Sequence, residues 1–211
     1  MKTRLTSGIA AAATAALTLT VAAPTQAADT TERRAGSTSL VEVLAADGTR
    51  LDRNWKDFDI LEQGVLAVLD AKPNSPVKVL ARGGKRATAF LPTDAAFRTL
   101  VKDLSGTRPA SERATLDALL GVADVDTLEA VLLYHVVAGK TLGSPKVLAA
   151  DGARLKTASG AKVGVRVKGS SVTLVDLDTD SPDARVVTVD VNKGNKQIGH
   201  AINRVLRPLD L

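Results

Sequence analysis

The 211-residue sequence contains no cysteine, and this absence excludes several kinds of chemistry and of stabilisation. No disulfide can cross-link the chain, no thiolate can act as a nucleophile, and no sulfur ligand is available for a soft metal ion. A lipid cannot be attached through a cysteine either. If the chain folds outside the cytoplasm, its hydrophobic core has to suffice without cross-links.

Aromatic residues make up only 2% of the sequence, so the core must be built from Val, Leu, Ile and Ala. Few rings are available to stack on bases, and the basic residues are dispersed, with only Arg33-Arg34 and Lys85-Arg86 adjacent. Nucleic-acid binding is therefore not predicted. A hydrophobic content of 45% with 24% charged residues indicates a globular chain, and the length favours one domain.

Histidine is also scarce, because the chain has only His135 and His200. Motifs such as G-x-S-x-G, a phosphate-binding P-loop and H-E-x-x-H are absent. The sequence thus predicts neither an enzyme nor a cofactor. Both histidines fall on apolar faces of their segments, so we expect them to be mostly buried and bonded to the backbone. Replacing either by Ala is expected to lower stability by roughly 1 to 3 kcal/mol.

The N-terminal segment has the pattern of an export signal. Lys2 and Arg4 precede an apolar run from Ile9 to Val21, and Thr25-Gln26-Ala27 forms a small-residue cleavage site. We predict a signal peptide at 1–28, a flexible lead-in at 29–38 and a folded domain at 39–211. No other stretch approaches the ~20 apolar residues of a membrane span. The mature protein is expected to be secreted, either extracellular or in the cell envelope.

A strand followed at once by a helix is predicted at 88–104. Thr88 to Leu91 is short and β-prone, Pro92 interrupts the strand, and Thr93 is a suitable N-cap for the helix that follows. The apolar stripe of this helix has i, i+3, i+4, i+7 spacing and consists of Phe97, Leu100, Val101 and Leu104.

Helices and strands are expected in different parts of the chain. Helical spacing of apolar residues predicts helices near 40–46, 60–69 and 111–121, and one that is capped by Asp126 or Thr127 and carries His135. Val77 to Leu80 is predicted to pair with Thr88 to Leu91 as a hairpin. Beyond Gly139 the alternation of apolar and polar residues predicts strands. The predicted fold class is α+β.

Three segments resemble the signature boxes of the fasciclin domain family: residues 88–97 (TAFLPTDAAF), 133–137 (LYHVV) and 199–208 (GHAINRVLRP). The resemblance covers Ser39 to Leu211. It implies a compact twisted β-sheet wedge with several packed α-helices, and adhesion through surface contacts. It also indicates Tyr134, His135 and His200 as binding residues. The closing box departs from the family pattern, since Asn203 stands where an acid is usual.

Two functions remain open at this level. The first is cell-surface or matrix adhesion through an extracellular protein or cell-envelope polysaccharide, and the alternative is a domain that binds a small molecule or calcium. The acidic run from Asp176 to Asp183 is the best metal candidate, but an EF-hand loop would need Gly and Glu where Ser181 and Val187 stand. We therefore predict a solvated loop there, no metal ligand, and no particular oligomeric state.

Overall fold

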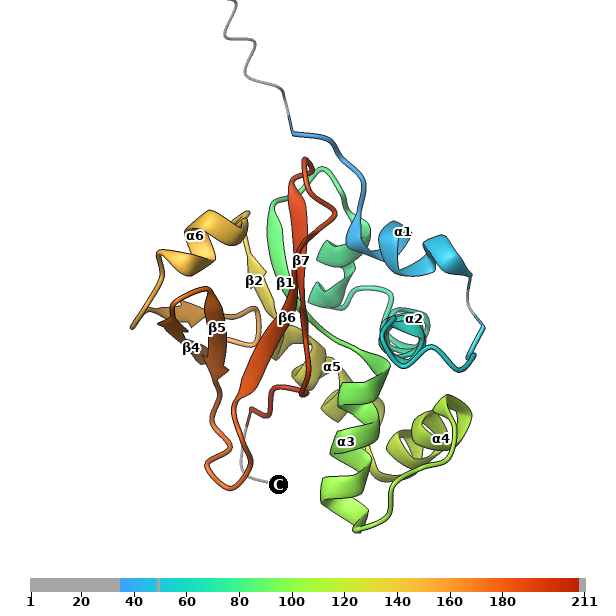
Figure 1. Ribbon diagram of the computed structural model, residues 1–211. Helices are drawn as coiled ribbons and strands as arrows, with labels where there is room; N and C mark the ends of the chain where they lie inside the picture. Colours follow the sequence, from blue (N-terminus) through green and yellow to red (C-terminus); the bar gives the residue numbers. More distant parts are fainter. Residues whose placement is uncertain (1–34, 49, 209–211) are drawn as a thin grey trace, which may run out of the picture. The chain divides into compact units, whose positions relative to one another are not determined.

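A seven-stranded sheet forms the centre of the fold, with helices α1 to α4 beside one face of its central strands (Figure 1). The computed structural model describes residues 35–48 and 50–208, which lie in a unit that begins at Arg34. The predicted signal peptide lies outside the described residues. The helices are α1 (Leu40–Leu44), α2 (Asp59–Ala71), α3 (Asp94–Ser105), α4 (Glu112–Val122), α5 (Val125–Tyr134) and α6 (Ser144–Leu148), with 3-10 helices η1 (Ala45–Asp47) and η2 (Pro76–Ala81).

The strand order is β2-β1-β7-β6-β5-β4-β3, and every neighbouring pair is antiparallel except β1 and β7. The strands are β1 (Ala87–Pro92), β2 (Val136–Ala138), β3 (Arg154–Lys156), β4 (Lys162–Lys168), β5 (Ser171–Val175), β6 (Ala184–Val191) and β7 (Gln197–Ile202). Helices and strands therefore coexist as predicted, and the fold is α+β.

Strands β1 and β7 are buried along their whole length. Successive residues of β1 face opposite sides: Ala89 and Leu91 pack with α1 and α2, whereas Phe90 packs with β4 and β5. This is the period of two that a strand imposes, and it explains why the strand is apolar on both faces except at Thr88, which is buried. The predicted strand and the helix after it are confirmed.

Gln197 is a buried polar residue that joins three segments. Its Oε1 accepts from the Leu40 amide at 2.8 Å, and its Nε2 donates to the carbonyls of Val79 and Arg82 at 2.6 and 3.0 Å. Nearby, the chain before α1 passes over Gly83 so closely that a Cβ there would lie 1.7 Å from the Ser37 carbonyl oxygen. These contacts fix α1 and η2 against β7.

Several local predictions are wrong. Val77 to Leu80 belongs to the 3-10 helix η2, not to a hairpin strand, because Ser75 caps it and Pro76 opens it. Helix α5 is capped by Asp124 and begins before Asp126. The other deviations concern apolar residues that were expected inside and are exposed: Leu104, Leu120, Val187 and Val189.

Candidate functional site

Tyr134 lies at the end of α5 and is fully buried. Its hydroxyl donates to the Lys162 carbonyl at 3.3 Å, and burial raises its pKa to about 12. The hydroxyl therefore stays protonated at neutral pH. It joins α5 to β4 and is not presented to a partner at the surface.

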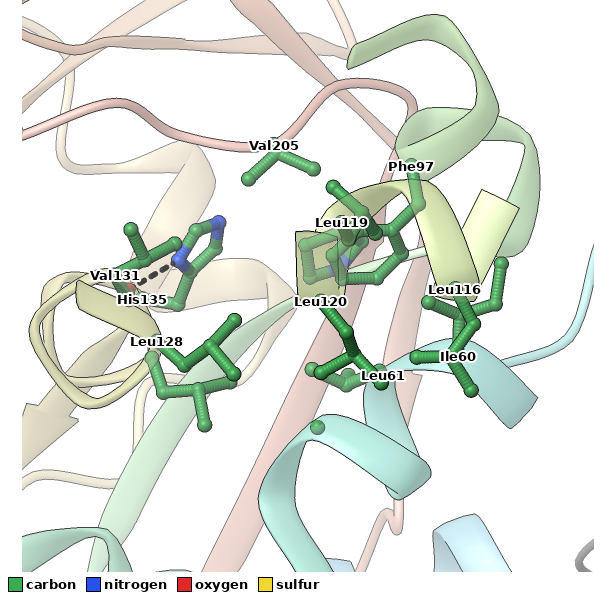
Figure 2. A pocket seen from close by; sticks show the side chains of 13 residues that line it. Ile60, Leu61, Phe97, Leu116, Leu119, Leu120, Leu128, Val131, His135 and Val205 are labelled. Atoms are coloured by element: carbon green, nitrogen blue, oxygen red, sulfur yellow. Dashed lines mark hydrogen bonds between the residues drawn. The ribbon is translucent and has the colours of Figure 1, made fainter. Parts of the chain in front are cut away.

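His135 is buried between α5 and the C-terminal segment. Its Nδ1 lies 2.7 Å from the Val131 carbonyl (Figure 2). Its Nε2 accepts from the Leu206 amide at 2.9 Å. An imidazole that donates through Nδ1 and accepts at Nε2 is neutral. Burial, only partly opposed by the bond to Val131, lowers its pKa to about 4. Its expected burial is confirmed.

His200 occupies the equivalent kind of position on β7. Its Nε2 lies 2.7 Å from the Leu142 carbonyl, and its Nδ1 accepts from the Asp190 amide at 3.4 Å. Burial lowers its pKa, while the Leu142 bond and Asp190 act in the opposite direction. The two histidines share no hydrogen-bond partner, so they do not converge on one reacting atom. Binding by Tyr134, His135 and His200 stays a prediction.

The His135→Ala substitution should lower the free energy of unfolding by roughly 1 to 3 kcal/mol at pH 7, because it leaves the Leu206 amide without its acceptor. It should also change the pH dependence. Between the ordinary pKa of 6.5 and the folded value of about 4, only the unfolded state binds the proton, so stability falls as pH falls. Urea titrations of both proteins between pH 7 and pH 4 should show that the free energy of unfolding falls more steeply with decreasing pH in the wild type than in the variant. Parallel curves would contradict this assignment.

An apolar pocket lies beside His135, between α2, α4, α5 and the C-terminal segment (Figure 2). Its volume is about 40 Å³. Pockets for small molecules usually measure roughly 300 to 1,000 Å³, so this one is too small for such a ligand. Leu120, with 48% of its surface exposed, carries this apolar lining to the outside of the protein.

The acidic run that was the metal candidate is tied to the C-terminal segment. The Arg207 guanidinium donates to Asp178 at 2.6 Å, and the Arg207 amide donates to Asp176 at 2.8 Å. Burial alone would raise the pKa of Asp178, but the Asp180 amide and Arg207 lower it. The prediction of a solvated loop is therefore wrong at Asp178, which is buried, and Arg207 supplies the positive charge that a cation would bring.

A basic groove of about 370 Å³ lies on η2 and the segment that leads into β1. Four of its lining residues are basic and none is acidic; the basic ones are Lys78, Arg82, Lys85 and Arg86. Within 35–48 and 50–208 none of these four forms a salt bridge. The sequence analysis missed the groove, because the 3-10 turn that brings Lys78 toward Arg82 was taken for a strand. The adjacent pair Lys85-Arg86 was its only sequence signal.

The chain was compared with known proteins and structures. A model of the fasciclin domain matches residues 66–208. A solved structure of a FAS1 domain pair from the insect cell adhesion molecule fasciclin I is similar at 14% identity and a TM-score of 0.49. The alignment covers 71% of this chain and 47% of that one, so the chain spans about half the length of that structure. No curated protein matches the sequence.

Proposed function

The chain belongs to the fasciclin domain family, and we propose that it is a secreted adhesion protein that binds an anionic polysaccharide of the cell envelope or matrix. Fasciclin domains are generally associated with adhesion. The observation that carries the choice of ligand is the basic groove, since its four cationic side chains face no carboxylate within the groove. We propose a binding role and no catalysis.

The dispersed charges of the groove suit a polymer better than a compact anion. Arg82, Lys85 and Arg86 are exposed, and Lys78 is partly so. An exposed ion pair contributes only about 0.2 to 1 kcal/mol, so a single carboxylate or sulfate would bind weakly. A chain that carries repeated negative charges could contact several of these side chains together. Such binding would weaken as salt screens the charges.

The test is binding of a named polyanion, polygalacturonate, by the purified protein at low and at physiological ionic strength. Removing three of the groove charges should weaken binding by about tenfold, if each contact contributes about 0.5 kcal/mol. The test variant replaces these residues by Ser: Arg82, Lys85 and Arg86. Calorimetry or sedimentation on immobilised polymer gives the dissociation constants.

A control variant of the same charge separates the groove from net charge. It replaces two exposed arginines and one exposed lysine outside the groove by Ser: Arg108, Lys146 and Arg154. This variant should bind like the wild type, and neutral dextran should bind to neither. Equal weakening in both variants would show that net charge alone is measured. Binding to an acidic protein but not to the polysaccharide would reject the proposed ligand.

Secretion and the domain limits are part of the same proposal. We propose that residues 1–28 are removed on export and that residues 29–38 lead into a domain at 39–211. Among the described residues, no helix is long and apolar enough to cross a membrane. Gly36 forms a bridge with Asn195 in the turn between β6 and β7, so contacts with the fold begin just ahead of the domain limit. Intact-mass measurement of protein recovered from the culture medium checks the cleavage.

The three residues of the signature boxes receive a supporting role in this proposal. Tyr134, His135 and His200 are buried and bonded to backbone carbonyls, so we propose that they fix the strands and helices under the binding surface. The alternative of a small-molecule site has little support, because the pocket beside His135 holds only about 40 Å³. The calcium alternative is favoured by a buried acidic cluster, which is described in the next subsection.

A further inference from the structure

Three helices begin at one place in the fold, and each begins with an acidic residue: Asp59 in α2, Asp94 in α3 and Glu112 in α4. Carboxylate oxygens of Asp57, Asp94 and Glu112 all lie within 4.8 Å of one another. Two of these carboxylates, those of Asp94 and Glu112, belong to residues with 0% exposure. Acidic side chains are therefore concentrated inside the protein.

Among residues 35–48 and 50–208, neither oxygen of the Glu112 carboxylate has a hydrogen-bond partner. Asp94 is half satisfied: its Oδ1 accepts from the Ile60 amide at 3.0 Å, whereas its Oδ2 accepts no hydrogen bond from any residue that the structure describes. Neither residue forms a salt bridge with another described residue. A buried carboxylate normally has hydrogen bonds or a cation, because leaving it without either is costly.

The helix N-termini offset only part of this charge. Each contributes about half of a positive elementary charge, so three of them fall short of three ionised carboxylates. Burial, together with the nearby Asp57, raises the pKa of Asp94 to about 8. Burial, with Asp57 and Asp52 adding to it, raises the pKa of Glu112 to about 7. Three carboxyl groups that are this close together, two of them fully buried and with unpartnered oxygens, need either protons or a shared positive ion.

We propose that Asp57, Asp94 and Glu112 form a binding site for a divalent cation of the size of Ca²⁺. Hard cations prefer carboxylate oxygens, and two oxygens on opposite sides of Ca²⁺ lie about 4.6 to 5.2 Å apart. Glu112 has both oxygens available and can bind in the bidentate mode. Mg²⁺ suits the site less, because it requires strict octahedral geometry and keeps several waters, for which a buried cluster has little room.

None of these residues lines the basic groove, so the inference is independent of the proposed function. The test uses the full-length mature protein, freed of metal with a chelator, at pH 7.5. At a Ca²⁺ concentration 100 times the dissociation constant, Tm should rise by about 5 to 10 °C, and equimolar Mg²⁺ should raise it less.

Terbium provides a second, local readout. Tb³⁺ is a hard cation that replaces Ca²⁺, and Trp55, the single tryptophan of the chain, can sensitise its luminescence. The Trp55 carbonyl accepts from the Ala95 amide at 2.9 Å, which places this residue beside Asp94. Sensitised emission should appear on Tb³⁺ addition and disappear when Ca²⁺ is added in excess.

The Glu112→Gln and Asp57→Asn variants should each lose the Tm response and the terbium emission, with affinity at least tenfold weaker. Without metal, Glu112→Gln should unfold at the same or a higher temperature than the wild type, because one repelling charge is gone. Asp126→Asn is the matched control, since Asp126 is an exposed acid in the first turn of α5, and it should respond like the wild type.

A wild-type protein that shows neither response would overturn the proposal and leave a cluster that holds protons only. Ca²⁺ affinity retained in both cluster variants would also reject it. An Asp180→Asn variant covers the other acidic segment. A response lost there, and kept in Glu112→Gln, would place the cation in the loop at Asp176 to Asp183.

Discussion

Gly83→Ala is expected to lower the free energy of unfolding by about 3 kcal/mol or more, since overpacking against atoms that cannot move is among the costliest substitutions. A Cβ at Gly83 would lie 1.7 Å from the Ser37 carbonyl oxygen and 2.8 Å from the Ser39 amide nitrogen. Both are backbone atoms of the segment that enters α1. The chain would have to lift away, and the bond from the Leu40 amide to Gln197 would be lost with it.

Gly84→Ala is the matched control, because a Cβ there meets nothing within 4 Å. Surface substitutions of this kind change stability by less than about 0.5 kcal/mol. Urea unfolding followed by circular dichroism measures both variants, and amide exchange at Leu40 reports the docking of α1. If the two variants lose the same free energy of unfolding, the N-terminal segment does not pass as close to Gly83 as the structure shows.

Arg207→Ala is expected to destabilise the protein by about 3 to 5 kcal/mol, which is the cost of leaving one member of a buried ion pair alone. The side chains of Arg207 and Asp178 are only 7% and 1% exposed, and their charged atoms lie 2.6 Å apart. The Asp178 carboxylate would be stranded in the interior once the guanidinium is removed. Stability should recover in part when Asp178 is replaced by Asn in the same protein.

Arg166→Ala removes a comparable contact at the surface and serves as the control. The Arg166–Asp183 pair is 3.4 Å apart, with side chains 67% and 27% exposed, so its loss should cost less than about 1 kcal/mol. Thermal unfolding of the two alanine variants gives the comparison. Similar costs for the buried and the exposed pair would mean that Asp178 is solvated after all.

The sequence predicted those parts of the fold that depend on local patterns. The segment from Thr88 to Phe97 shows this well, because the change from a buried strand to an amphipathic helix occurs at Pro92 and is visible in composition alone. The burial of His135 and His200 also followed from periodicity. Predicting that these two histidines are buried required only the pattern of neighbouring residues on the same helix or strand.

Errors arose where two local patterns compete or where distant segments meet. Val77 and Leu80 are both buried, and their spacing of three residues fits a 3-10 helix. The sequence analysis assigned this segment to a strand instead. Asp57, Asp94 and Glu112 come from three separate segments, and each alone appears as an ordinary acid near a helix start. Asp178 was expected in solvent because its partner, Arg207, lies far along the chain.

The parallel pairing of β1 with β7 has a consequence for biosynthesis. Residues 87–92 find their partners only at 197–202, so this pair cannot form until residue 202 has left the ribosome. Contacts between such distant segments form slowly, because a long loop must close before any of them is gained. The β1–β7 pairing is therefore expected to form late in folding, after the residues between the two strands have been synthesised.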